Sequence, residues 1–186
     1  HLILLAKNYN GYKNLMKIVS TGHIEGMYYG KPRVSHWVVE KYATDLVCCS
    51  ACIAGEIPRN ILGGNMEGAE KAIEWHKKVF GDDYYLEVQL HRTEVPGQSL
   101  EVYEKQLVVN EGIFSLAEKT GTKVIATNDV HFVNKEDGPA HDRLICLTTN
   151  VYLDNPDRLR YTQQEYLKSE EEMAMLFPDH PEVLSN

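Results

Sequence analysis

An aspartate and a histidine stand two positions apart after an apolar run in TNDVHF, residues 127–132. In an extended segment, residues i and i+2 point to the same side of the backbone, so the side chains of Asp129 and His131 are expected to converge. A neutral imidazole beside a carboxylate is a normal half-site for zinc, manganese or iron. The alternative is that Asp129 caps the next turn and His131 lies on the surface. The motif therefore predicts part of a metal site and leaves this alternative open.

A cysteine and a histidine elsewhere in the chain are two further candidate ligands. Cys52 ends the run LVCCSAC, where a thiolate is a soft metal ligand and a buried thiol is only a small hydrophobic group. Cys49 and Cys52 also fit a C-x-x-C spacing, but residues three apart on a strand face opposite ways and no second pair is present, so we reject that interpretation. His1 opens the first apolar run, and by itself it does not indicate a metal site.

Two loops combine glycine, aromatic and basic residues, GMYYGKPRV (26–34) and GEIPRN (55–60). Through Lys31, Arg33 and Arg59 such loops can contact phosphate or a nucleic-acid backbone, although packed turns have the same composition. Glu87 falls inside a predicted strand, where a buried carboxylate needs a partner that the sequence does not identify. His76 is expected to pack on a helix, and the other histidines are expected to be solvated: His23, His36, His91, His141 and His180.

Four short apolar runs rich in Val, Ile, Leu or Tyr are expected to be the strands that position these residues. They are His1–Ala6, Asp45–Cys52, Tyr84–Leu90 and Lys123–Val130. Helical patterns lie between them, and this alternation predicts βα units with a parallel sheet. Four such units make half a barrel or a small open sheet.

The helices are predicted from apolar spacing and from their end signals. The stripe Tyr12, Leu15, Met16 and Val19 predicts a helix that ends at Gly22, and Ser35 is placed to cap a short helix carrying Trp37, Val38 and Tyr42. Two longer helices are expected over 69–80 and 100–117, closed by Gly81 and Gly121, and a short one over 139–147. Ser169 and Glu172 form a predicted capping box for a terminal helix.

The bulk composition is that of an ordinary globular domain, with 43% hydrophobic and 25% charged residues among 186. A net charge of -8 argues against a broad basic face that wraps nucleic acid, although a local contact stays open. No apolar stretch approaches the roughly 18–20 residues that cross a bilayer, so no membrane partner is expected. Three of the four cysteines share one apolar segment, which is typical of a reducing compartment and predicts a cytoplasmic protein.

Several segments together carry a resemblance that no single motif does. HLILLAKNYNGYKNLMKIVS, EGMYYGKPRV, SACIAGEIPRN, ATNDVHF and YLKSEEEMAMLFPDHPEVL follow one another along the whole chain. In this order and spacing they resemble the PHP (polymerase and histidinol phosphatase) domain at the N-terminus of bacterial DNA polymerase III alpha subunits. The resemblance implies an α/β fold in which residues 1–150 are the second half of a seven-stranded (βα) PHP barrel, with about four parallel strands alternating with helices. Residues 151–186 are then an irregular segment and a terminal helix leading out of the domain.

The resemblance also implies a function and a ligand set. The barrel mouth of the family holds metal ions on histidine, acidic and cysteine ligands, which here correspond to His1, Cys52, Asp129 and His131. Zinc, manganese or iron is expected there, magnesium is expected in the parent polymerase, and the fragment itself is expected to be metal-free or inactive. The implied partners are DNA, the proofreading exonuclease subunit and the sliding clamp. The resemblance leaves three alternative functions open. The domain removes a mispaired 3′ end, or it is a scaffold that docks the proofreading subunit, or it is a free-standing phosphoesterase.

The chain is expected to be a piece of a longer protein, because it starts inside a strand-like run without methionine and the family's earlier ligands are expected upstream. A half barrel leaves strand edges unpaired, and unpaired edges attract further strands. We therefore expect the strand over residues 1–6 to be covered by the terminal helix or by self-association with a second copy.

Overall fold

The computed structural model describes residues 1–186 and divides them into two compact units. Unit 1 comprises His1–Leu86 with Leu116–Lys123, and unit 2 comprises Glu87–Ser115 with Val124–Asn186. Strand β5 (Tyr84–Val88) and helix α5 (Glu101–Thr120) each run through the border between these segments. The two units are described separately below.

The main sheet has four strands in the order β1-β4-β5-β6. The other three strands are β1 (Ile3–Ala6), β4 (Leu46–Cys49) and β6 (Lys123–Ala126). Each of the four predicted strands is confirmed, and each is shorter than its apolar run. β4 and β5 are parallel, with Cys48 opposite Tyr84. The mixed α/β class expected from the sequence is therefore confirmed.

The prediction that all the strands are parallel is wrong for β1, which runs antiparallel to β4 with Ile3 opposite Cys49 and Ala6 opposite Leu46. The backbone N–H of Lys7, just after β1, donates to the carbonyl of Asp45, just before β4, at 2.9 Å. The chain therefore re-enters the sheet at the end where it left it. An antiparallel pair is the direct result, since a parallel pair needs a crossover to the opposite end.

Helix α1 (Tyr9–Ile24) begins at Asn8, whose side chain accepts from the N–H groups of Asn10 and Gly11. The helix is confirmed, but it continues past Gly22 and its buried face is not the predicted one. The buried residues are Gly11, Asn14, Ile18 and Gly22, whereas Tyr12, Met16 and Val19 are exposed. The inner face includes two glycines, and at Gly11 the helix lies very close to its neighbour: a Cβ there would stand 2.1 Å from the carbonyl oxygen of Asp45.

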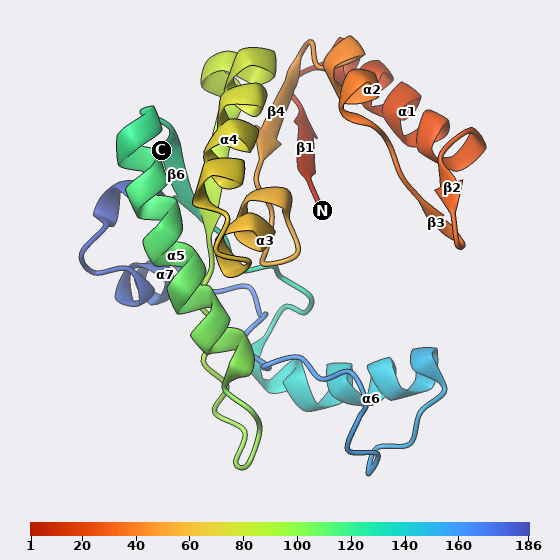
Figure 1. The fold of residues 1–186 in the computed structure, drawn as a ribbon. Coiled ribbons are helices and arrows are strands. Elements are labelled where there is room, and N and C mark those ends of the chain that lie inside the picture. The colour runs from red at the N-terminus through yellow and green to blue at the C-terminus, as the bar shows by residue number, and fades with distance from the viewer. The chain divides into compact units, whose positions relative to one another are not determined.

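A β-hairpin follows α1 (Figure 1), where the sequence predicted only a loop. Its strands are β2 (Met27–Tyr28) and β3 (Lys31–Pro32), paired antiparallel. The two residues between them have positive φ, 46° at Tyr29 and 74° at Gly30, as in the hairpin turns that match the twist of the strands. Helix α2 (His36–Lys41) then begins after Ser35 as predicted, although the Ser35 side chain makes no capping hydrogen bond.

Helices α3 (Glu56–Leu62) and α4 (Met66–Phe80) complete unit 1 and pack against each other, and α4 also packs on β4 (Figure 1). The segment GEIPRN, predicted as a loop, is the start of α3, since Pro58 lies in the first turn, where proline is tolerated. α4 ends at Gly81, with φ of 59°, as predicted. The unit's core includes the fully buried Ile57, Ile73 and Leu86.

Unit 2 contains most of α5, the end of β5, most of β6, and helices α6 (Gly138–Thr149) and α7 (Glu170–Leu176). The capping box of α7 is confirmed: the Ser169 hydroxyl accepts from the Glu172 N–H, and the Glu172 carboxylate accepts from the Ser169 N–H. Short 3₁₀ turns occupy Gly81–Asp83 in unit 1 and Lys135–Asp137 and Pro181–Leu184 in unit 2. α6 ends at Thr149, and the domain boundary at residue 150 stays a prediction. No helix combines the length and the apolar character that crossing a bilayer requires.

Candidate functional site

The structure brings two of the predicted ligands together in unit 1. The Sγ atom of Cys52 lies 3.6 Å from Nδ1 of His1, whose terminal ammonium also donates to the carbonyl of Ala54 at 3.2 Å. His1 precedes β1 and Cys52 follows β4. Because these strands are antiparallel, the start of one lies beside the end of the other. The strand direction that the sequence did not predict is therefore what places His1 against Cys52.

The predicted geometry of Asp129 and His131 is wrong, because β6 ends at Ala126 and the following backbone is not extended. Asp129 has φ of 43°, in the left-handed region, so the rule that i and i+2 share a side does not apply. Nδ1 of His131 instead lies 2.5 Å from the backbone carbonyl oxygen of Asp129. A carbonyl can only accept, so Nδ1 carries a proton, and in the neutral ring Nε2 then carries the lone pair. That tautomer is the one in which an imidazole binds a metal through Nε2.

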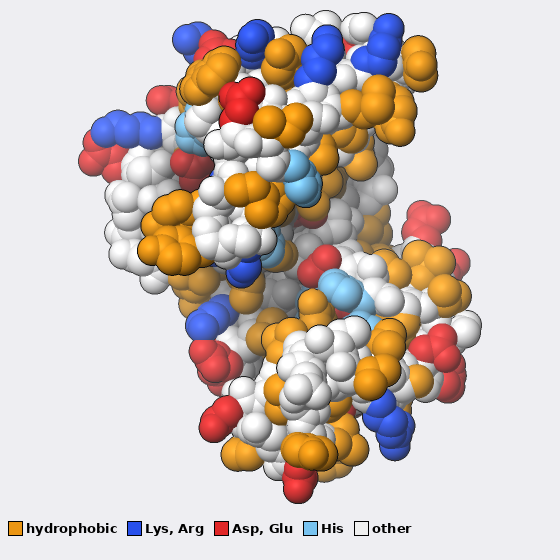
Figure 2. Space-filling view, turned by 90° about the vertical axis from the view of Figure 1, so that its right-hand side faces the viewer, with side chains coloured by type: hydrophobic (Ala, Val, Ile, Leu, Met, Phe, Trp, Pro, Cys, Tyr) orange, Lys and Arg blue, Asp and Glu red, His pale blue; other side chains and the backbone are white.

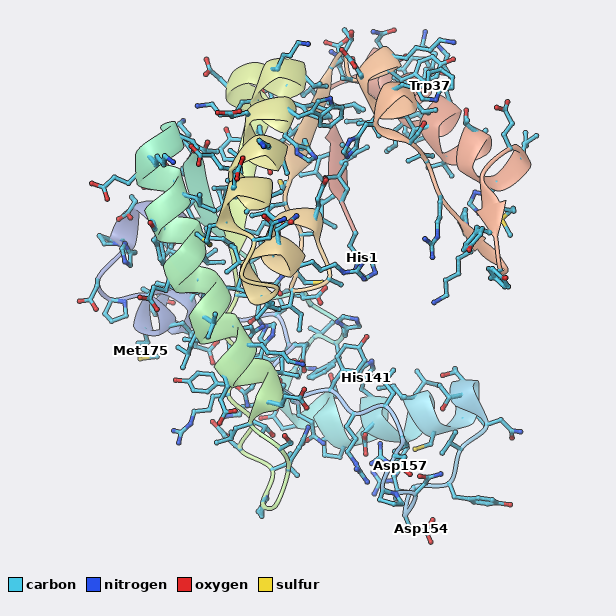
Figure 3. All side chains as sticks on the ribbon, viewed as in Figure 1. His1, Trp37, His141, Asp154, Asp157 and Met175 are labelled. Atoms are coloured by element: carbon cyan, nitrogen blue, oxygen red, sulfur yellow. The ribbon has the colours of Figure 1, made fainter.

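The ring of His131 belongs to an aromatic cluster that the sequence did not predict. Its centroid lies 4.5 Å from that of Tyr161 and 5.6 Å from that of His141. His141 projects from the first part of α6 (Figure 3) and also contacts Phe132, rather than being simply solvated as expected. These residues are up to 30 positions apart, so no local pattern could have revealed the cluster.

A buried polar network holds the segment that leads to Asp129. His91 is only 3% exposed, and its Nδ1 accepts from the Gln106 amide at 3.0 Å while Nε2 donates to Oδ1 of Asn128 at 3.1 Å. Burial lowers the pKa of His91, which keeps the ring neutral. Asn128 donates in turn to the carbonyls of Gln164 and Tyr166. The expectation that His91 is solvated is therefore wrong, and the network fixes the backbone next to Asp129.

Two further contacts support the same segment. The His131 N–H donates to the carbonyl of Glu165 at 2.8 Å, which ties the loop to the stretch before α7. The buried Glu87 carboxylate, for which the sequence gave no partner, accepts from the Thr127 hydroxyl at 2.7 Å. Gln89 donates to the same hydroxyl oxygen at 2.9 Å. Buried polar groups at the ends of β5 and β6 thus satisfy one another.

The chain's own donors do not make a complete metal site. In neither unit do three His, Cys, Asp or Glu side chains lie close enough together to hold an ion. Catalytic zinc sites usually have three protein ligands and structural ones four. His1 and Cys52 supply two donors of suitable type. A complete metal site therefore needs further ligands besides this pair.

The predicted phosphate-binding residues lie on different elements. Lys31 is in β3, and Arg33 follows it with its guanidinium 4.9 Å from the ring centre of Tyr28. Arg59 is an exposed residue of α3. No contact decides whether these side chains bind phosphate, and that assignment stays a prediction.

Comparison with known proteins agrees with the resemblance seen in the motifs. Residues 1–91 match the PHP domain. Over its whole length the chain is 45% identical to the DNA polymerase III subunit alpha of Borreliella burgdorferi and 40% identical to that of Treponema pallidum. It is 36% identical to the same subunit of Thermus aquaticus, over 96% of its residues. The chain is therefore similar to DNA polymerase III alpha subunits along its whole length. It spans about 15% of the length of these curated relatives: 15%, 15% and 14% in the same order.

The similarity to alpha subunits gives the ligand candidates a context. His1 and Cys52 both fall inside the residues that match the PHP domain, whereas Asp129 and His131 lie beyond that match. All of them lie within the alignment to the alpha subunit of Borreliella burgdorferi, which covers 100% of the chain.

Proposed function

We propose that the chain is part of the alpha subunit of a replicative DNA polymerase III, the subunit that synthesises DNA in the bacterial cytoplasm. The observation that carries this proposal is the alignment of the whole chain with alpha subunits, at 45% identity in one case. A free-standing phosphoesterase is a poorer proposal, because the aligned relatives are polymerase subunits many times longer than the chain. DNA, magnesium at the polymerase centre, the proofreading exonuclease subunit and the sliding clamp are proposed partners of the parent protein.

We propose further that the sheet is the second half of a seven-stranded barrel and that His1, Cys52, Asp129 and His131 are ligands of its metal site. Zinc, manganese or iron suits this donor set, since imidazole nitrogen, thiolate and carboxylate are all present. The 3.6 Å contact between His1 and Cys52 and the Nδ1-protonated tautomer of His131 support the assignment. The remaining ligands are proposed to lie upstream in the parent protein, because the chain's own donors do not complete a site.

In the complete site the proposed reaction is removal of a mispaired 3′ nucleotide from DNA. This chain contributes ligands and the hydrogen bonds that orient them. Its residues supply no general base that the geometry identifies, so no proton transfer is assigned to them. Lys31, Arg33 and Arg59 are proposed contacts to the phosphate backbone.

The test is a pair of assays on the intact parent polypeptide, primer extension and release of nucleotides from a mispaired 3′ end. We expect both the parent and its His131→Ala variant to extend the primer. Only the parent is expected to release nucleotides from the mispaired 3′ end. His23→Ala is the matched control, since His23 is also an exposed histidine whose Nδ1 lies against a backbone carbonyl, that of Val19 at 2.9 Å. A parent that cannot extend a primer contradicts the polymerase assignment. Extension without any nucleotide release favours the scaffold that docks the proofreading subunit.

A further inference from the structure

The first 44 residues have a charge opposite to that of the rest of the chain. They contain six lysine and arginine residues against two glutamates, a net charge of +4. The other 142 residues contain 13 basic and 25 acidic residues, a net charge of −12, which gives the total of −8. Within unit 1, α1, the β2–β3 hairpin and α2 therefore form a local basic region in an acidic protein.

Most of these cations have no carboxylate partner. Lys7 pairs with Asp83 at 2.6 Å, but none of the other five forms an ion pair. Several lie over aromatic rings instead: Lys13 is 5.2 Å from the ring centre of Tyr9, and Lys41 is 5.7 Å from that of Trp37. The positive charges are thus free to attract an anion and stand beside flat apolar surfaces.

The aromatic rings of this region are exposed. Tyr9 is 72% exposed, Trp37 60% and Tyr29 89%, and the rings of Tyr28 and Tyr29 meet edge to face at 4.6 Å. Trp37 stands on the outer side of α2 (Figure 3). α2, β2 and β3 all contact α1, and we call the exposed basic and aromatic side chains of these four elements the basic aromatic surface. Figure 2 shows basic and hydrophobic side chains next to one another over the upper part of the molecule.

We propose that the basic aromatic surface binds single-stranded DNA. Exposed aromatic rings give the unpaired bases of a single strand a surface to stack on, and neighbouring lysines and arginines neutralise its phosphates. A duplex hides the faces of its bases, so it leaves the rings unused. An acidic protein segment would neutralise the cations, but it does not account for the five exposed aromatic residues, which are Tyr9, Tyr12, Tyr28, Tyr29 and Trp37. The inference rests on the proposed function in so far as DNA is the substrate of the parent polymerase, and it adds a site outside the metal ligands.

Trp37 provides a direct reporter for this site. The chain has two tryptophans. Trp75 lies on α4, where its ring stacks on that of His36 with the centroids 4.2 Å apart, and Trp75→Phe leaves Trp37 as the only tryptophan. With this variant of the 186-residue chain, titration with an oligothymidylate of about 15 nucleotides, the upper range of site sizes for such surfaces, is expected to quench the Trp37 emission. Binding is expected to weaken with salt, as counterions compete for the phosphates.

Two sets of variants separate stacking from charge. Tyr12→Ala and Tyr29→Ala are each expected to weaken binding by roughly fivefold to a hundredfold, the usual effect of removing one stacking ring. Lys17→Gln and Lys41→Gln are each expected to lower the slope of log K against log salt by about 0.7, the value for one phosphate contact on a single strand. Lys78→Gln is the matched control, because it removes the same charge from an exposed position of α4 and is expected to change neither quantity.

The outcomes that overturn the proposal are distinct from a failure of the proposed function. Absence of Trp37 quenching at low salt, with circular dichroism showing a folded chain, overturns it even if the parent extends primers normally. If Lys78→Gln weakens oligothymidylate binding as much as Lys41→Gln does, the binding is general charge attraction. This result also overturns the proposal. If sedimentation equilibrium shows that the wild-type chain is a dimer and that Tyr12→Ala is not, the surface binds a second copy of the chain. This result overturns the proposal as well. Loss of primer extension in the parent, with oligothymidylate binding intact, contradicts only the polymerase assignment.

Discussion

Burial keeps two histidine side chains of this chain in the neutral state. His76 is 1% exposed, its ring stacks on that of Tyr84 at 4.9 Å, and its Nδ1 donates to the carbonyl of Ala72 at 2.7 Å. Burial lowers the pKa of His76 and of His91 below the ordinary value of 6.5. Both rings therefore stay neutral in the folded chain at a pH where the unfolded chain already binds protons.

This difference predicts a loss of stability in acid. The stability due to the neutral rings is complete above the unfolded pKa of 6.5 and is lost as the pH falls from there toward the lower folded values. His76→Phe keeps an aromatic ring against Tyr84 and removes one titrating group, so its urea midpoint is expected to fall less between pH 7 and pH 5 than that of the wild type. His23→Phe, at an exposed position, is expected to show the full wild-type loss. An equal loss in wild type and His76→Phe contradicts the explanation.

The helices and strands were easier to predict than the way they face their neighbours. Apolar runs located all four strands of the main sheet, and end signals located α4 and α7, because these depend on local sequence. Periodicity placed α1 but assigned its apolar stripe to the core. Its buried face is made of Gly11, Asn14, Ile18 and Gly22, which fit a close approach that only the three-dimensional structure reveals. The direction of β1 likewise depends on the contact between Lys7 and Asp45, residues 38 positions apart.

The close approach of α1 predicts a contrast between two glycines of one helix. Gly11→Ala is expected to lower the free energy of unfolding by roughly 1–3 kcal/mol, the usual cost of overpacking, because the new methyl group would meet the carbonyl of Asp45 at 2.1 Å. At Gly22 the nearest atom is a side-chain methyl of Val34 at 3.2 Å, which is able to shift. Gly22→Ala is expected to be neutral or slightly stabilising, since alanine favours the helix. Urea denaturation that shows equal effects at both positions would contradict this packing.

An ion pair with two hydrogen bonds ties residues 153–160 of the irregular segment to α6. Arg158 donates through both terminal nitrogens to the Asp142 carboxylate on α6, each at 2.6 Å, and its side chain is only 6% exposed. The pair borders a cavity of about 660 Å³ lined by residues of unit 2, including Val95, Gln98 and Arg160. Residues 153–160 therefore depend on this contact for their position.

Breaking this ion pair has a predictable local effect. Asp142→Asn is expected to destabilise the chain by roughly 1.5–3 kcal/mol, the range for a hydrogen bond to a charged group, and to speed proteolysis within residues 153–160. Lys71→Gln breaks the exposed pair with Glu67 and is expected to leave both properties unchanged, because exposed pairs contribute little. Limited proteolysis with mass spectrometry measures the effect, and unchanged cleavage in Asp142→Asn would show that the segment is held by other contacts.

At the scale of the whole molecule, the resemblance to alpha subunits was recognisable from the sequence, whereas the candidate metal site was only partly predictable. Ordered motifs along 186 residues indicated a resemblance to alpha subunits, and the alignments confirmed that resemblance. The residue types of His1, Cys52, Asp129 and His131 suggested a metal site, but spacing alone could not place them. The contact of His1 with Cys52 arises from an antiparallel strand pair, and the orientation of His131 arises from a left-handed Asp129. Neither feature has a local sequence signal.

The decisive measurement is the metal content, by elemental analysis, of the parent polypeptide and of its His131→Ala variant, purified alike. The proposed ligand set predicts that the parent retains zinc, manganese or iron after dialysis and that His131→Ala lowers the metal content. His23→Ala, the matched surface histidine, is expected to leave the content unchanged. A parent without metal, or a metal content equal in His131→Ala and the wild type, would contradict the assignment of His131 and its neighbours as ligands.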